Sequence, residues 1–271
     1  KMNRNYFALI TFVLLLSCSG AANRKSTLTP TNDTIVTNIA SDTLNSMNNV
    51  SIDKKTALDS VKMLLPGGRY TIGKESQIIN NSWKEFYRDT ITGNYCIDRA
   101  KYTVSTYTDE CLGMECEYIK SGRNSLFFIN MPTLKNGIVD SIPIGTGYIA
   151  PKTPMVINFN SSKYTISVFA ELSDENKEEY EPNKEYSYWC NYKMTLCKDN
   201  SQEVELFNID KFYDSVLRLL FAGDIDGDGK LDLIFDSHIN YEEESITLFL
   251  SSLAGNGIIT RVAKASISYD C

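Results

Sequence analysis

The chain has 271 residues, of which 42% are hydrophobic and 23% are charged. This balance is ordinary for a folded globular protein and excludes a collagen-like chain, a long coiled coil and wholesale disorder. The 27 basic and 34 acidic residues give a formal net charge of −7, so we expect no nucleic-acid partner, because phosphate binding needs a basic surface.

The beginning of the sequence has the features of an export signal. Lys1 and Arg4 precede an apolar run, Tyr6 to Leu16. As a helix this run is about 16 Å long, too short for a bilayer core of about 30 Å. A charged start, a short apolar stretch and then small residues are typical of secretory signals. We therefore predict that residues 1–17 are a signal peptide, the alternative being a buried helix.

A cysteine, Cys18, follows the apolar run in the order Leu15-Leu16-Ser17-Cys18. This order resembles the lipobox of bacterial lipoproteins, in which the cysteine is lipidated and becomes the mature N-terminus. The resemblance implies a protein of the bacterial cell envelope, held at a membrane by acyl chains on Cys18. We expect that membrane to be the outer membrane, on its periplasmic or its surface side.

The segment after the cysteine has the composition of a linker. Residues 19–51 are rich in Ser, Thr and Asn and contain no aromatic residue. Such a segment cannot bury enough apolar surface to offset its ordering entropy. We therefore predict that residues 18–52 comprise the lipidated cysteine and a flexible tether, and that residues 53–271 form a β-rich domain.

A short helix is expected at the start of this domain, over residues 53–65. Asp53 can cap it, and Pro66 and the two glycines after it end it. Its apolar residues recur at near-helical spacing; they are Ala57, Leu58, Val61, Leu64 and Leu65.

Beyond Arg69 the apolar pattern has a period of two, which indicates strands. In Lys163–Ala170, for example, apolar and polar residues alternate. Many short strands separated by turn residues predict a mainly β fold, an antiparallel sandwich or barrel-like single domain. The other strands are expected at 125–130, 155–159, 187–196, 202–209, 216–221, 231–236, 245–250 and 258–268.

Six cysteines follow Cys18, an even number that suggests disulfides in an exported chain. Cys111 and Cys116 flank a short loop and are the one pair that the spacing favours. Cys190 and Cys197, on one strand, would be about 23 Å apart and cannot pair with each other. The remaining pairing, which also involves Cys96 and Cys271, stays open.

The strongest motif is an acidic loop near the end of the chain. Its first three acidic residues occupy alternate positions, Gly229 holds the sixth position, and Lys230 would offer its backbone carbonyl. Alternating carboxylates with a glycine at the sharp turn can surround a calcium ion with oxygen atoms. The expected side-chain ligands are Asp224, Asp226, Asp228 and Asp232.

The loop is not an EF-hand, because Phe235 occupies the position of the bidentate glutamate and both flanks resemble strands. The order D-x-D-x-D-G-x-x-D between strands instead resembles the calcium loops of FG-GAP and VCBS-type repeats. That resemblance implies Ca²⁺ held by the four aspartates and by the carbonyl of Lys230. It covers residues 219–236, and a second copy of the loop is absent from the sequence.

Other motifs are weaker. Gly68–Lys74 has the spacing of a P-loop, but Glu75 replaces the magnesium-binding hydroxyl. His238 is the only histidine, and we expect it to be a surface or packing residue rather than a catalytic one. We therefore predict a calcium-binding, lipid-anchored binding module for a protein or carbohydrate ligand, rather than an enzyme. The alternative is an exported hydrolase, acting for example on polysaccharide, that uses paired carboxylates.

Overall fold

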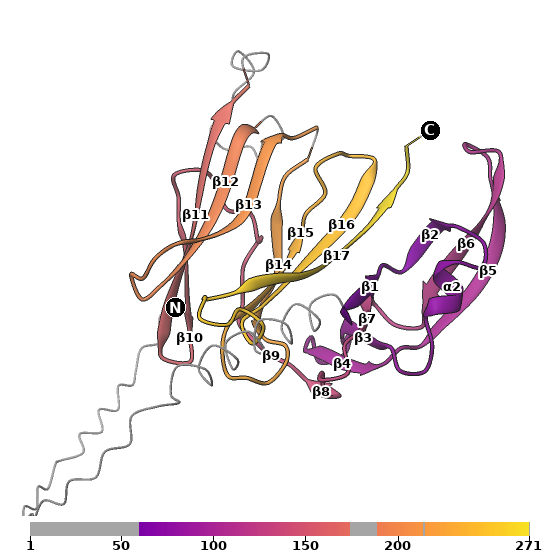
Figure 1. Cartoon of the computed structure of the whole chain (residues 1–271), viewed down its shortest axis with the longest axis horizontal. Coiled ribbons are helices and arrows are strands. Elements are labelled where there is room, and N and C mark those ends of the chain that lie inside the picture. The colour runs from indigo at the N-terminus through magenta and orange to yellow at the C-terminus, as the bar shows by residue number, and fades with distance from the viewer. Residues whose placement is uncertain (1–59, 174–188, 214, 271) are drawn as a thin grey trace, which may run out of the picture. The chain divides into compact units, whose positions relative to one another are not determined.

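The computed structural model describes residues 60–173, 189–213 and 215–270 (Figure 1). The predicted signal peptide (residues 1–17), Cys18 and the tether (18–52) lie outside these ranges. Among the described residues, no helix is both long and apolar enough to cross a membrane.

The fold is mainly β, as the sequence predicts, and the described strands pair only in antiparallel fashion within four sheets. The central sheet has the order β17 (Thr260–Ser268), β16 (Glu243–Leu250), β15 (Asp232–Asp236), β14 (Arg218–Asp224) and β9 (Asp140–Ser141). The outer sheet has the order β10 (Met155–Phe159), β11 (Ser162–Leu172), β12 (Trp189–Lys198) and β13 (Val204–Lys211).

The remaining two sheets come from the N-terminal half. The first sheet has the order β1 (Lys62–Leu64), β7 (Ser125–Asn130), β3 (Lys84–Arg88), β4 (Tyr95–Arg99) and β8 (Gly137–Ile138). The hairpin sheet has the order β2 (Gly67–Tyr70), β6 (Met114–Ser121) and β5 (Tyr102–Asp109), and a four-residue helix, α2 (Glu75–Ile78), follows β2 in the chain.

The central sheet is buried on both faces. Because side chains alternate between the two faces of a strand, each strand can contribute to two cores. On β16, Leu248 and Leu250 belong to one hydrophobic core and Phe249 belongs to the other. The first core joins the central sheet to the two N-terminal sheets, and in it the ring of Phe221 meets that of Phe86 at 5.1 Å. The second core joins it to the outer sheet, and in it Phe207 meets Phe249 at 5.4 Å.

The helix expected over residues 53–65 ends earlier than predicted. Residues 53–59 lie outside the described ranges and Ser60 is helical, whereas Lys62–Leu64 form strand β1, which pairs with β7. Met63, Leu64 and Leu65 are all buried in the first core. A short run of consecutive apolar residues fits a buried strand as well as a helix, and here pairing with β7 decides between them.

The expected disulfide between Cys111 and Cys116 is also wrong. Cys111 is disulfide-bonded, but Cys116 is a free thiol. Cys116 lies inside the β5–β6 ladder opposite Tyr107 and is 3% exposed, whereas Cys111 lies in the exposed turn beyond Asp109. The short sequence spacing therefore does not bring the two side chains together.

Four of the six cysteines after Cys18 do not form the disulfides that their even number suggests. Cys96, Cys190 and Cys197 are free thiols, as is Cys116. Cys190 and Cys197 both lie on β12, as the sequence predicts, and each sulfur lies near a backbone carbonyl oxygen rather than another sulfur.

Candidate metal centre

The acidic loop joins β14 to β15, two neighbouring antiparallel strands of the central sheet, so its strand–loop–strand setting is as predicted. The ladder closes at the pair Gly223–Asp232, directly before the loop residues begin. Gly227 and Gly229 have φ values of 78° and 77°. Only glycine adopts this conformation without steric cost, which explains the glycine at the sixth position.

The carboxylate of Asp224 organises the loop around itself. It accepts hydrogen bonds from the backbone nitrogens of Gly227 at 2.8 Å, Asp228 at 3.0 Å and Gly229 at 2.8 Å. These bonds wrap the chain about the side chain of the first loop residue. A carboxylate has about four lone-pair sites; Oδ1 accepts two of these bonds and Oδ2 accepts one, so Oδ2 can bind a cation while all three bonds are kept.

The structure brings three of the four predicted carboxylates together. Asp224, Asp226 and Asp232 each have a carboxylate oxygen within 4.8 Å of the others. Asp232 is fully buried, and its two oxygens accept hydrogen bonds from the backbone nitrogens of Ile225 and Ser251, both at 2.8 Å. Those bonds fix the carboxylate at the start of β15, facing the loop.

Asp226 supplies an oxygen atom without a partner. Its Oδ2 accepts a hydrogen bond from the hydroxyl of Ser252, but its Oδ1 is buried and accepts none. A buried carboxylate oxygen without a hydrogen bond is costly, because its desolvation is not compensated. A cation among the three carboxylates would remove that cost, so the donor set fits a hard metal ion.

The cluster is electrostatically unfavourable without a cation. Burial raises the pKa of Asp232 to about 8, and the nearby charge of Asp226 adds to the rise. Burial also raises the pKa of Asp226, with smaller contributions from the charges of Asp228 and Asp224. Both carboxyl groups therefore resist ionisation unless positive charge is placed beside them.

The other two predicted ligands lie differently. The carboxylate of Asp228 is outside the group of three and accepts hydrogen bonds from the Ser251 hydroxyl at 3.1 and 3.0 Å and from the Lys230 backbone nitrogen at 2.8 Å. The Lys230 ammonium lies 3.4 Å from the same carboxylate, and its side chain is 58% exposed. Metal ligation by Asp228 and by the Lys230 carbonyl stays a prediction.

Two serines outside the loop motif contribute to the site. Ser251 and Ser252 follow the end of β16 and hydrogen-bond to Asp228, Asp232 and Asp226. They lie too far from the loop in the sequence to be recognised as part of its motif, and only the pairing of β15 with β16 brings them near it. From the outer sheet's side, Asn160 donates a hydrogen bond to the Gly229 carbonyl at 3.0 Å.

The lone histidine lies apart from this loop. His238 Nδ1 is 2.5 Å from Asp236 Oδ1, and the pair lines a cavity of about 450 Å³ that also includes Glu243 and Glu244. The hydrogen bond to Asp236 raises the pKa of His238 above its usual value. Glu243 is partnered by the Lys264 ammonium at 3.5 Å.

Comparison with protein-family models, with curated proteins and with solved structures finds no match to this chain.

Proposed function

We propose that this chain is a calcium-binding, lipid-anchored protein of the bacterial cell envelope that acts as a binding module for a protein or carbohydrate ligand. The observation that carries the calcium assignment is the group of three carboxylates of Asp224, Asp226 and Asp232, in which Asp232 is buried and one oxygen of Asp226 lacks a hydrogen-bond partner. The lipid anchor is supported by the order of residues around Cys18 alone.

Calcium is the ion that suits this donor set best. It takes six to eight oxygen ligands in flexible geometry, whereas magnesium demands a near-ideal octahedron and zinc prefers nitrogen and sulfur. The three grouped side chains offer only carboxylate oxygens. Asp228 and the Lys230 carbonyl are the further protein ligands that the motif implies.

The location of the loop favours a structural role for the ion. The carboxylates are tied by hydrogen bonds to Ser251 and Ser252, which continue β16. An ion here would hold the β14–β15 loop against the end of the neighbouring strand. An ion that binds only the folded chain stabilises it by mass action, about 2.7 kcal/mol at 100 times the dissociation constant.

Titration calorimetry of the apo protein with CaCl₂ and with MgCl₂ tests the assignment. We expect saturable calcium binding, weaker magnesium binding, and loss of the calcium heat in Asp224→Ala. Lys230→Ala is the matched control, because only its backbone carbonyl is implicated. Absence of binding heat at millimolar calcium, with the wild-type protein folded, would reduce the loop to an acidic turn.

The anchor is tested separately, by metabolic labelling of the expressed full chain with a palmitate analogue. We expect label on the wild type and none on Cys18→Ala. Equal label on both would remove the anchor from the proposal without affecting the calcium site.

The alternative, an exported hydrolase with paired carboxylates, draws support from the cavity beside Asp236 and His238. This cavity also contains Glu243 and Glu244, and glycoside hydrolysis uses two carboxyl groups. Release of reducing ends from a panel of polysaccharides, lost in Asp236→Asn, would favour the hydrolase. No release from any polysaccharide of the panel would favour the binding module.

A further inference from the structure

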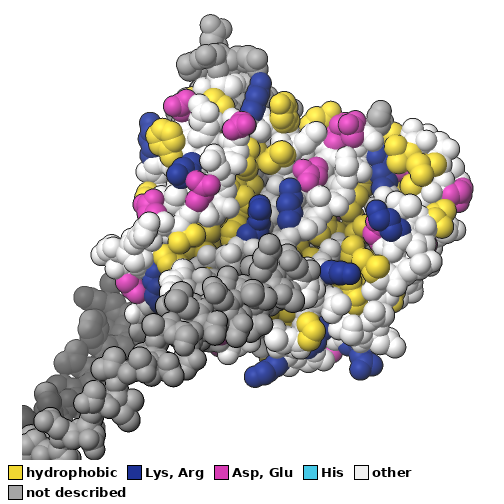
Figure 2. Space-filling model, viewed as in Figure 1, with side chains coloured by type: hydrophobic (Ala, Val, Ile, Leu, Met, Phe, Trp, Pro, Cys, Tyr) yellow, Lys and Arg dark blue, Asp and Glu magenta, His cyan; other side chains and the backbone are white. Residues whose placement is uncertain are grey.

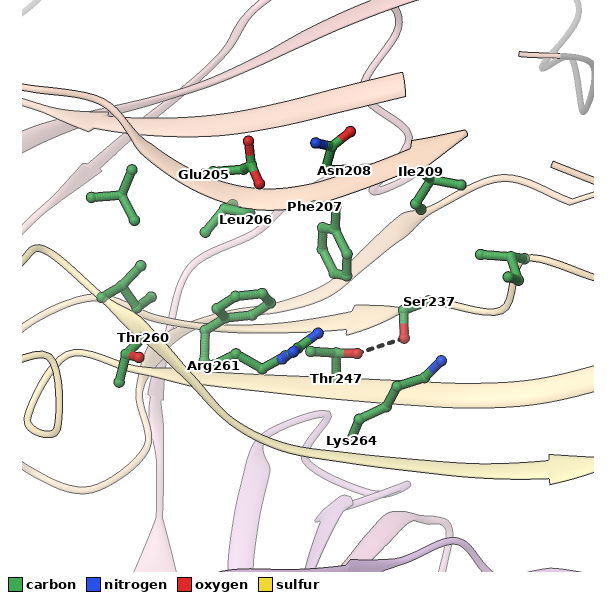
Figure 3. A pocket seen from close by; sticks show the side chains of 14 residues that line it. Glu205, Leu206, Phe207, Asn208, Ile209, Ser237, Thr247, Thr260, Arg261 and Lys264 are labelled. Atoms are coloured by element: carbon green, nitrogen blue, oxygen red, sulfur yellow. Dashed lines mark hydrogen bonds between the residues drawn. The ribbon is translucent and has the colours of Figure 1, made fainter. Parts of the chain in front are cut away.

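A groove runs between the outer sheet and the central sheet, with β13 along one side and β16 and β17 along the other (Figure 3). Its volume is about 540 Å³, within the range of ligand-binding clefts. Six consecutive residues of β13, Val204–Ile209, line it. Because side chains of a strand alternate between two faces, such a run indicates that the backbone edge of β13 itself borders the groove.

The edge of β13 is free to pair. β13 is the last strand of the outer sheet, and among the described residues no other strand pairs with its second edge. A β-bulge at Leu206 turns both Leu206 and Phe207 inward, where they are buried. In Figure 3 the side chains of Glu205 and Asn208 lie on the opposite side of the β13 backbone from that of Phe207, although both residues also border the groove. The side chains that β13 turns toward the central sheet are therefore apolar, and among the described residues the backbone groups along its edge have no partner strand.

A second bulge puts two cations on the opposite wall. On β17, Arg261 pairs with Phe249 and Lys264 pairs with Thr247, and Val262 is the extra residue. Residues three apart in a regular strand face opposite sides, whereas here the bulge sets both cations on the face that carries Phe249. Both side chains extend into the space below β13 (Figure 3).

These cations stand out in an acidic chain of net charge −7. Lys264 has one acidic neighbour, Glu243 at 3.5 Å, and no ion pair of Arg261 exists among the described residues. Figure 2 shows basic side chains beside hydrophobic ones over the region where β13 faces β16 and β17. The groove therefore offers an apolar floor, positive charge and a free strand edge together.

We propose that this groove binds an extended acidic peptide segment of a partner protein, which adds to β13 as a further strand. The free edge supplies main-chain hydrogen bonds, and the inward side chains of the added strand face Arg261 and Lys264. This inference rests on the proposed role as a binding module and names the class of its ligand.

The spacing of the cations matches such a ligand. Their partners on β16, Phe249 and Thr247, are two residues apart, which is about 6.8 Å along a strand. Two acidic residues at positions i and i+2 of an added strand have the same separation and point to the same face. The strands of face-to-face sheets lie within about 30° of each other, so the two rows can run side by side.

The test is fluorescence anisotropy with the calcium-loaded protein and a labelled, end-blocked peptide Thr-Glu-Thr-Glu-Thr. We expect saturable binding that weakens as salt is raised and binding about tenfold weaker in Arg261→Glu/Lys264→Glu. Arg99→Glu/Lys120→Glu is the matched control, because these exposed cations lie on β4 and β6. Should the reversed pair fail to fold, Arg261→Gln/Lys264→Gln serves in its place.

Strand addition is tested with two N-methylated versions of the peptide. One version carries the methyl groups on the glutamates and the other carries them on the threonines. Because only alternate N–H groups of an added strand face its neighbour, one version should bind about tenfold more weakly and the other should bind normally. Equal binding of both versions would overturn strand addition.

Two other results would overturn the choice of ligand. One is no peptide binding by a protein that calcium stabilises, which leaves the calcium site intact but rejects the groove as a peptide site. The other is tighter binding of a galacturonic acid oligomer than of the peptide, with the same loss in the charge-reversed variant, which would make the groove a site for acidic glycans.

Discussion

Asp226→Asn should change the stability of the protein in opposite directions with and without calcium. The variant keeps the size of the side chain and its contact with Ser252 but removes one charge from the group of three. At 4.8 Å and an effective dielectric constant of 20, two carboxylates repel by about 3 kcal/mol. Part of this repulsion is already relieved in the apo protein, because the pKa of Asp232 is raised to about 8. We therefore expect the variant to gain about 1 kcal/mol in EDTA.

In saturating calcium the sign reverses, because the wild type gains about 2.7 kcal/mol at 100 times its dissociation constant and the variant loses most of that gain. For a domain of this size, 1 kcal/mol corresponds to about 2–4 °C in melting temperature. The wild type should thus melt about 5–11 °C higher in calcium than in EDTA, and the curves of Asp226→Asn should nearly coincide.

Differential scanning calorimetry of the wild type and the variant in both buffers measures the four melting temperatures. Asp210→Asn, an exposed change on β13, is the control and should respond to calcium like the wild type. If Asp226→Asn were less stable than the wild type by the same amount in both buffers, the carboxylate would act through its hydrogen bond and not through a cation.

Three further changes test other parts of the structure. The pKa of His238 is raised, first by its hydrogen bond with Asp236, and this contributes stability that is present below pH 6.5 and is lost as pH rises through the folded pKa. The free energy of unfolding of His238→Gln should therefore fall furthest below that of the wild type near pH 5.5. A constant difference across pH 5.5–8 would contradict this. Gly223→Ala places a Cβ 2.0 Å from the Asp140 carbonyl oxygen and should lower the free energy of unfolding, measured in urea, by about 1–3 kcal/mol. An unchanged urea midpoint would show that β9 does not hold this position. Without reductant, Cys116 should react with iodoacetamide only in the unfolded protein, unlike the three part-exposed thiols; rapid labelling of it in the native state would mean that the β5–β6 hairpin opens.

Local sequence patterns predict the strands and the loop between β14 and β15, because both depend on neighbouring residues. The bounds expected for β7 and β10 coincide with those observed. The positive φ of Gly229 also follows from its position in the loop. A few consecutive residues determine both the alternation of side chains along a strand and the need for glycine in a turn.

Features that depend on which strands become neighbours could not be predicted. Ser251 reaches the acidic loop only because β16 pairs with β15. Cys116 is a free thiol because the register of the β5–β6 hairpin places it opposite Tyr107. Both bulges that shape the groove, at Leu206 and Val262, are properties of a strand pair rather than of one strand.

The two candidate sites lie where the packing of the central sheet leaves room for them. A sheet that is covered on both faces cannot bind a ligand through its middle, because each inward side chain is already packed in one of the two cores. Polar groups that can bind a ligand are then found in the loops at the strand ends and on the edge strands, where backbone groups remain unpaired. The acidic group of Asp224, Asp226 and Asp232 occupies the first kind of position. Arg261 and Lys264, on the last strand of the sheet, occupy the second kind.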